Sequence, residues 1–194
     1  TALCTIFALA GAPAAQAGGG KGSSLGLLGG FIRGLTYSAS DVSDDGLLVL
    51  RSTNIQDGSL VLDKDLVFVS KGCSSELLLR NGDIVICMSN GSKALVGKNA
   101  EYFGNYRRNL TIGAFCSVFR PKLPFAKLIF QTECYSDFVL LSIGGGNINN
   151  LKNSVLEKFK AIIPQKKEEQ VKIADCISSL NALIAAQADK LDAL

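Results

Sequence analysis

Amide and cationic side chains crowd the segment from residue 89 to residue 109. Lysine and arginine neutralise phosphates or bind the edge of guanine, and asparagine pairs with adenine, so this mixture has the chemistry that reads nucleic acid. Aromatic residues stand at 102, 103 and 106, and we expect the segment to form exposed loops on a rigid sheet. The competing interpretation is a solvated loop whose charges only keep the protein in solution. The candidate DNA contacts in this segment are Asn90, Lys93, Lys98, Asn105, Arg107 and Arg108.

Four further residues are candidates for DNA contact, each with a structural alternative. Arg51 and Asn54 follow an apolar run, where they could contact DNA or pin the next turn. Tyr37 could pack in the core or touch a base or sugar. Lys71, beside a glycine, could reach a phosphate, although an ordinary surface lysine is the simpler interpretation.

The distribution of charge supports a nucleic-acid partner better than its sum does. The net charge is only +3. From residue 71 to 127, however, nine basic side chains face three acidic ones, a local balance of +6, whereas residues 25–70 carry a balance of −3. An uneven field of this kind is the electrostatic signature expected of a binding surface.

The residues that usually carry catalysis are missing. The chain has no histidine, the commonest general base and metal ligand. Its six cysteines are widely spaced, without the paired spacing of a zinc or redox motif, and several lie in apolar runs typical of buried free thiols. No nucleotide-binding motif is present, and the glycines at 144–146 lack the spacing of a phosphate loop. We therefore expect no enzyme activity, no cofactor and no metal, and a cytoplasmic location, although spacing alone leaves a metal-carboxylate nuclease open.

Short strands and turns must position these residues, because apolar runs alternate with turn signals between residues 25 and 141. A D-G pair at 57–58 and an N-G pair at 81–82 mark two turns, and a strand ends at Pro121. The first two-thirds of residues 124–144 have helical spacing. The glycine-rich residues 17–24 predict a flexible stretch. The apolar residues before it resemble a secretory signal, but they lack a basic flank and a leading Met. We expect instead a vector-derived or misassigned tail, or a short apolar helix packed on the domain.

The last third of the chain has a different pattern. Residues 155–164 predict a short helix or turn and then a strand that ends at Pro164, and a long helix begins near Lys167. Apolar positions recur in steps of four and three, as in the seam of a coiled coil, so a partner helix is expected. Gln187 either sets the register or marks where the seam opens to solvent. The seam residues are Ile173, Ile177, Leu180, Ile184, Gln187, Leu191 and Leu194.

Three segments together resemble the specificity subunit of type I restriction-modification enzymes. The first contains RGLTYSASDV and LLVLRSTNIQDGSL, and the second is NGDIVICMSNGSKALVGKNA. The third contains GGGNINNL, FKAIIP and EEQVKIADCISSLNALI. The resemblance covers residues 25–194. Members of that family usually carry two recognition domains and two spacer helices, whereas this chain has one of each, so we expect a half-length subunit or a fragment that ends within the helix.

The resemblance implies a mixed α+β fold in three parts. Residues 1–24 form an apolar and glycine-rich segment of uncertain role, residues 25–165 a β-rich target-recognition domain, and residues 166–194 a spacer helix. The implied function is sequence-specific recognition of double-stranded DNA, with chemistry left to a modification (methyltransferase) subunit and, through it, a restriction subunit. The helix would pair with a second recognition domain or a second copy, and no membrane is involved. The alternatives are a coiled-coil interaction adaptor and the recognition part of a fused restriction-methylation enzyme.

Overall fold

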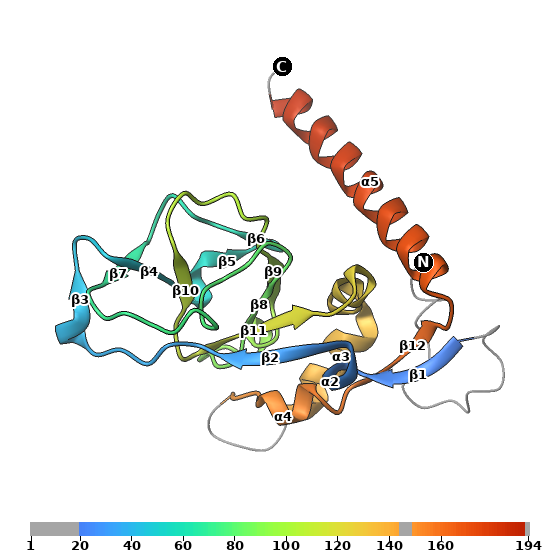
Figure 1. Cartoon of the computed structure of the whole chain (residues 1–194), viewed down its shortest axis with the longest axis horizontal. Helices are drawn as coiled ribbons and strands as arrows, with labels where there is room; N and C mark the ends of the chain where they lie inside the picture. Colours follow the sequence, from blue (N-terminus) through green and yellow to red (C-terminus); the bar gives the residue numbers. More distant parts are fainter. Residues whose placement is uncertain (1–19, 144–148, 193–194) are drawn as a thin grey trace.

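The structure is a computed structural model that describes residues 20–143 and 149–192 (Figure 1). The expected apolar tail and the glycines at 144–146 lie outside the described residues. Strand β1 (Gly20–Ser24) pairs antiparallel with β12 (Lys160–Pro164), so the predicted flexibility of residues 20–24 is wrong. The small side chains of β1 contribute little packing, but its backbone groups form hydrogen bonds with β12, which comes much later in the chain.

An antiparallel sheet in the order β2-β11-β8-β9 carries the centre of the domain. Strand β8 follows the predicted N-G turn at 81–82 and is a continuous apolar run. Ile84 and Ile86 face one hydrophobic cluster, whereas Val85 and Cys87 face another. Because side chains alternate along a strand, an uninterrupted apolar run is what a strand buried on both faces requires. The strands are β2 (Gly29–Arg33), β8 (Ile84–Cys87), β9 (Asn99–Glu101) and β11 (Cys116–Pro121).

A second sheet, in the order β10-β4-β7-β3, packs across the first. Its β10–β4 pair is parallel and its other pairs are antiparallel. Leucine, isoleucine and valine side chains from both sheets fill the space between them. The strands are β3 (Val42–Ser43), β4 (Leu47–Leu50), β7 (Val67–Val69) and β10 (Leu110–Ile112).

The predicted D-G turn joins a small hairpin of β5 (Ile55–Gln56) and β6 (Ser59–Leu60). Asp57 and Gly58 both have positive φ angles, 48° and 75°, as a two-residue hairpin turn demands. Short 3-10 turns occupy Ala39–Asp41, Ser52–Asn54 and Lys93–Leu95.

Helical structure covers the other face of the first sheet. The helix expected from residue 124 is interrupted: a 3-10 segment, η4 (Pro124–Gln131), is followed by α3 (Glu133–Ser142). Thr132 causes the break, because its hydroxyl donates to Ile129 O at 2.7 Å and accepts from Tyr135 N at 3.2 Å, which caps α3. The remaining short helices are α2 (Leu25–Leu28) and α4 (Asn153–Leu156).

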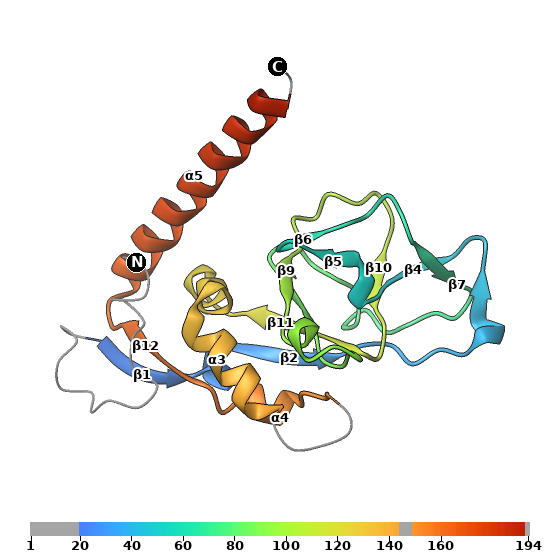
Figure 2. The same ribbon diagram turned by 180° about the vertical axis from the view of Figure 1, so that it is seen from behind.

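Helix α5 (Lys167–Asp192) projects from the globular body at the end where β1 and β12 lie (Figures 1 and 2). Its first turns are attached to that body, since Ile173 and Ile177 pack against the cluster formed by η4 and α3, and Ala174 is buried. The side chain of Gln170 donates to Pro164 O at 2.7 Å. The predicted β12 and the start of α5 near Lys167 are both confirmed, as is the mixed α+β fold class. Among the described residues, no helix combines the length and apolar character needed to cross a bilayer.

Candidate nucleic-acid interface

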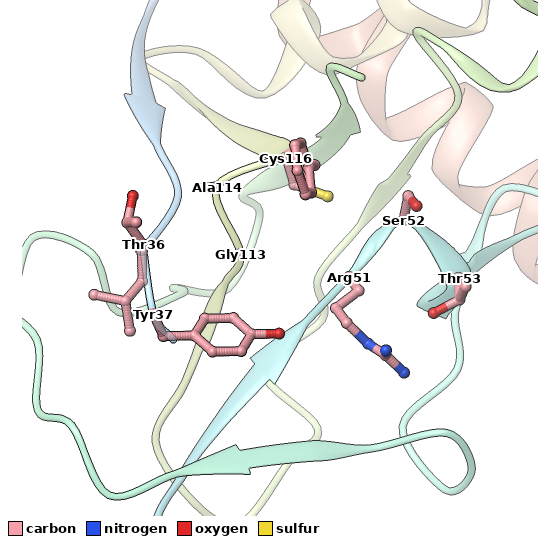
Figure 3. A pocket seen from close by; sticks show the side chains of 10 residues that line it. Thr36, Tyr37, Arg51, Ser52, Thr53, Gly113, Ala114 and Cys116 are labelled. Carbon is pink, nitrogen blue, oxygen red and sulfur yellow. The ribbon is translucent and has the colours of Figure 1, made fainter. Parts of the chain in front are cut away.

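Three backbone segments enclose a pocket of about 510 Å³ at the C-terminal end of β4 (Figure 3). One segment follows β2, one follows β4, and the third is the turn between β10 and β11. Figure 3 shows the Tyr37 hydroxyl pointing across the pocket toward the side on which Arg51 lies. The lining residues are Leu35, Thr36, Tyr37, Arg51, Ser52, Thr53, Gly113, Ala114, Phe115 and Cys116.

Gly34 allows two of these segments to meet. A Cβ atom built on Gly34 would stand 2.1 Å from the carbonyl oxygen of Gly113, so the backbones cross at a distance that only glycine permits. Leu35 N donates to Ile112 O at 2.7 Å, and Gly113 N donates to Leu50 O at 2.8 Å. Because β4 and β10 are parallel, both strands end on the same side of the sheet, and the segments that follow them line the pocket.

The structure distinguishes Arg51 from Asn54, for which the sequence left the same two roles open. Asn54 is buried, accepts from Arg51 N at 2.9 Å, and donates to Val61 O and Lys64 O. It pins the turn and is not available to a ligand. The Arg51 side chain is half-buried and donates through Nη2 to Asp65 O at 3.1 Å, whereas its Nε is buried without a partner among the described residues.

The loop after β8 is joined to the same pocket. Asn90 Nδ2 donates to the Ser52 hydroxyl at 3.4 Å, and Asn90 Oδ1 accepts from Ser92 N. Met88 N and Ser89 N both donate to Phe115 O, so this loop and the turn that bears Phe115 are held together. Lys93 is exposed, and within the described chain its ammonium has no hydrogen-bond or ion-pair partner.

Lys71 lies on the other side of the pocket, where its ammonium donates to Thr36 O at 2.8 Å. Tyr37 is half-buried and packs beside Leu35 and Val49. The candidates from distant parts of the chain therefore gather on one surface, which we call the Arg51 face. It comprises Tyr37, Arg51, Ser52, Lys71, Asn90 and Phe115, and we count Lys93 with it because Lys93 follows Asn90 by three residues in the same loop.

The remaining predicted contacts lie elsewhere. Residues 89–109 do not form one exposed loop, because β9 runs through the segment in the first sheet. Lys98 Nζ donates to Ile55 O at 2.8 Å from a partly buried position, which ties the hairpin to the sheet. Arg108 forms an ion pair with Asp45 before the N-terminal end of β4, whereas Arg51 follows its C-terminal end. Asn105 lines a different pocket with residues 60–64, and Arg107 is exposed beside it in sequence.

The excess of six positive charges in residues 71–127 does not form a surface of unpaired cations. Three of its cations pair with carboxylates: Arg108 with Asp45, Arg120 with Asp83, and Lys127 with Glu101. Three more donate to backbone carbonyls: Lys71, Lys98 and Lys122. Within the described part of the chain, only the side chains of Arg80, Lys93 and Arg107 make no hydrogen bond or ion pair.

Sequence reasoning missed Phe115 and Ser52. The sequence predicts a strand that ends at Pro121, but Phe115 precedes β11 and is 70% exposed in the turn before it. The residues around it, GAFCSVF, carry an apolar signal that does not separate a strand residue from a turn residue. The preceding glycine was the only available sign of a turn.

The pocket is equipped for binding and holds no activated nucleophile. Burial raises the pKa of Cys116 to about 12, so this thiol stays protonated at neutral pH. Burial also raises the pKa of Cys87 beneath the pocket, although Lys98 opposes the shift. The described residues contain no cluster of three or more His, Cys, Asp or Glu that could hold a metal ion. The groups offered to a ligand are the Arg51 guanidinium, hydroxyls and two aromatic rings.

Comparison with known proteins identifies relatives of one kind. The model of the type I restriction modification DNA specificity domain matches residues 65–194. The chain is 36% identical over 163 residues to the EcoKI specificity subunit of Escherichia coli K12, an alignment that covers 79% of this chain and 34% of that protein. It is 32% identical over 171 residues to the StySPI specificity subunit of Salmonella potsdam, covering 84% of this chain and 36% of that protein. The chain thus spans about a third of the length of these relatives.

Solved structures share the fold. The HsdS subunit of Thermoanaerobacter tengcongensis matches with a TM-score of 0.66 at 19% identity, over 95% of this chain and 42% of that one. The type I restriction-modification S subunit of M. genitalium matches with a TM-score of 0.57 at 12% identity, over 92% of this chain and 43% of that one.

Proposed function

This chain belongs to the family of type I restriction-modification DNA specificity domains, and on that premise we propose that its globular part binds duplex DNA through the Arg51 face. The chain selects a site, and partner modification and restriction subunits carry out the chemistry. The observation that supports this surface above others is the convergence of Arg51, Lys71 and Asn90 around a pocket with two aromatic rings, with Lys93 in the same loop as Asn90. Cations, amides and aromatic rings on one face are the groups that bind phosphates and base edges.

Lys93→Ala is expected to weaken binding to all duplexes alike. Lys93 has no partner in the described chain, so its charge is free to neutralise a phosphate. Each such contact contributes about 0.9 to the slope of log K against log salt concentration, and the slope should fall by about that amount. Fluorescence anisotropy with a labelled duplex, titrated at several salt concentrations, measures both quantities.

Lys160→Ala is the matched control for this measurement. Lys160 is also exposed, but it lies in β12, at the opposite end of the domain from the Arg51 face (Figure 1). The control should bind like the parent. If Lys160→Ala weakens binding as much as Lys93→Ala does, the Arg51 face is not the DNA-binding surface. An affinity of the parent chain that stays flat as salt rises would favour the alternative of an interaction adaptor.

We propose that the outer part of α5 pairs with a helix of a partner. Ile173 and Ile177 pack on the chain's own domain, so the seam that is left for a partner begins at Leu180. Leu180 and Ile184 are 49% and 67% exposed, and Leu183 beside them is 64% exposed. Apolar residues in this number on one projecting helix favour burial against a second helix. Gln187 is exposed at the end of this patch, and the side chain of Leu191 and all of Leu194 lie outside the described structure.

The partner of this patch is a second recognition domain, a second copy of the chain or the modification subunit. The helix of 26 residues is roughly 39 Å long at 1.5 Å per residue, comparable with one DNA turn of about 34 Å. A helix of this length would place two recognition domains over segments of the major groove that are about one DNA turn apart. The full chain with its modification subunit is the form in which to test the assembly.

The double variant Leu180→Asp/Ile184→Asp is expected to abolish this association while the domain stays folded. Both side chains are exposed, so the change costs the folded chain little, but it would bury two carboxylates at a helix pair. Asn181→Asp is the control, because it adds a charge at an exposed position of the same helix. Light scattering coupled to gel filtration reports the mass of the complex. An unchanged mass for the double variant would refute the proposed seam.

A further inference from the structure

We propose that Arg51 reads a guanine of the target and that Phe115 contacts the neighbouring base pair, which makes both residues determinants of sequence specificity. This inference rests on the proposed DNA-binding function and adds to it the identity of one base and the groups that read it. Its starting point is a guanidinium that the fold holds in place and leaves without a counter-ion.

Arg51 is prepared for a ligand with two acceptors. It is the one charged residue among the described residues that line the pocket. Its Nη2 is held by Asp65 O at 3.1 Å, and its backbone N is held by the Asn54 side chain at 2.9 Å. No carboxylate among the described residues pairs with it, and its buried Nε has no acceptor. Its Nη1 makes no hydrogen bond to a described residue and is not among the buried polar atoms, so the outer end of the guanidinium can donate to a ligand.

The surroundings of Arg51 favour a base edge over a phosphate. Leu35, Tyr37 and Phe115 give the pocket apolar and aromatic walls, which suit a base better than a strongly hydrated phosphate. The exposed cations of the same face, Lys71 and Lys93, stand outside the pocket, where the phosphate backbone would pass. In the major groove guanine presents N7 and O6, two acceptors that match the fork of an arginine, whereas adenine replaces one of them with a donor.

Phe115 supplies a rigid apolar contact beside that base. Its ring is 70% exposed, yet the backbone beneath it is fixed: Cys116 N donates to Gly113 O at 2.9 Å, and Phe115 O accepts from Met88 N at 2.8 Å. An aromatic ring on a fixed turn loses little entropy on binding, and an apolar side chain at a base edge favours the methyl group of thymine. In the free protein, the exposure of this apolar ring to water is unfavourable, and contact with a base would relieve it.

The test selects bound sequences from random duplexes, using the full chain together with its modification subunit. The parent should enrich a site that contains a guanine. Arg51→Lys keeps the charge but loses the fork, so the preference for guanine at one position should fall on the order of tenfold to a hundredfold, with the salt slope unchanged. Phe115→Ala, a change at an exposed side chain, should relax the choice at the adjacent position. Lys93→Ala should lower affinity without altering the selected sequence.

The outcomes separate the inference from the function on which it rests. If the parent enriches no site and binds DNA without salt dependence, the proposed function fails. If the parent enriches a site that Arg51→Lys and Phe115→Ala select unchanged, or a site without guanine, the function stands and the inference is overturned. Thermal melting of each variant shows whether a changed selection is caused by unfolding. If Arg51→Lys fails to fold, Phe115→Ala provides the test. An unchanged selection by this variant then overturns the proposed reading pocket.

Discussion

Arg120→Ala is expected to lower the free energy of unfolding by about 3 kcal/mol, because it leaves the carboxylate of Asp83 buried without its counter-ion. Asp83 is 1% exposed, and Arg120 grips it at both oxygens, with Nε at 2.9 Å from Oδ1 and Nη2 at 2.7 Å from Oδ2. The value lies at the lower end of the range for buried pairs, since the Arg120 side chain itself is 23% exposed. The hydrogen bonds that Arg120 donates to Asp83 raise the pKa of Arg120, so this guanidinium stays charged at neutral pH.

Arg120 also ties two parts of the domain together. Its Nη1 and Nη2 donate to Glu76 O and Leu78 O, so the segment before β8 is held against β11. Urea denaturation followed by circular dichroism measures the loss of stability. Arg108→Ala is the matched control, because both members of its ion pair with Asp45 are exposed and its loss should change stability little. Equal midpoints for Arg120→Ala and the parent would show that the buried ion pair is not a determinant of stability.

Gly34→Ala should destabilise the domain by roughly 1–3 kcal/mol and weaken DNA binding, because overpacking against backbone cannot be relieved by a rotamer change. The new Cβ would lie 2.1 Å from Gly113 O and 2.7 Å from Ile112 O. Either the segment that carries Tyr37 or the turn that carries Phe115 must move. Thermal melting and the anisotropy assay at low salt measure the two effects on the same preparation.

Gly30→Ala provides the comparison for this change. Gly30 lies in β2 on the same stretch of chain, is exposed, and would place its Cβ in open space. Alanine there should melt and bind DNA like the parent. If Gly34→Ala also behaves like the parent in both assays, the crossing of the two backbones does not build the pocket. A loss of stability without any loss of DNA affinity would show that the crossing of the two backbones is not needed for DNA binding.

The local elements of the domain could be predicted because their causes are local. The D-G pair predicts the β5–β6 hairpin, since its two residues adopt the positive φ angles of such a turn. The apolar run of β8 and the start of α5 near Lys167 follow from residue types and spacing alone. The interruption at Thr132 was missed because threonine is tolerated within a helix as well as at its N-cap.

The candidate site was predicted only in part, for a physical reason. Sequence reasoning named cations and amides as the candidate residue types and placed Arg51, Asn90 and Lys93 among them. It could not tell Arg51 from Asn54, three positions apart, since the difference is that Asn54 points into the turn made by residues 61–65. It also overlooked Phe115, whose exposure depends on the turn between two paired strands.

By itself, the sequence determined β8, the β5–β6 hairpin, the start of the long helix and the chemical character of the candidate surface, because these depend on residue type and short-range spacing. The family followed from the resemblance of three segments. Only the tertiary structure decided which cations remain free. Lys98 is occupied by a carbonyl 43 residues away and Arg108 by a carboxylate 63 residues away. The parallel pairing of β4 with β10 and the crossing of Gly34 with Gly113 likewise join distant segments. Contacts over such separations leave no local pattern, and they are what assembles Arg51, Asn90 and Phe115 into one face.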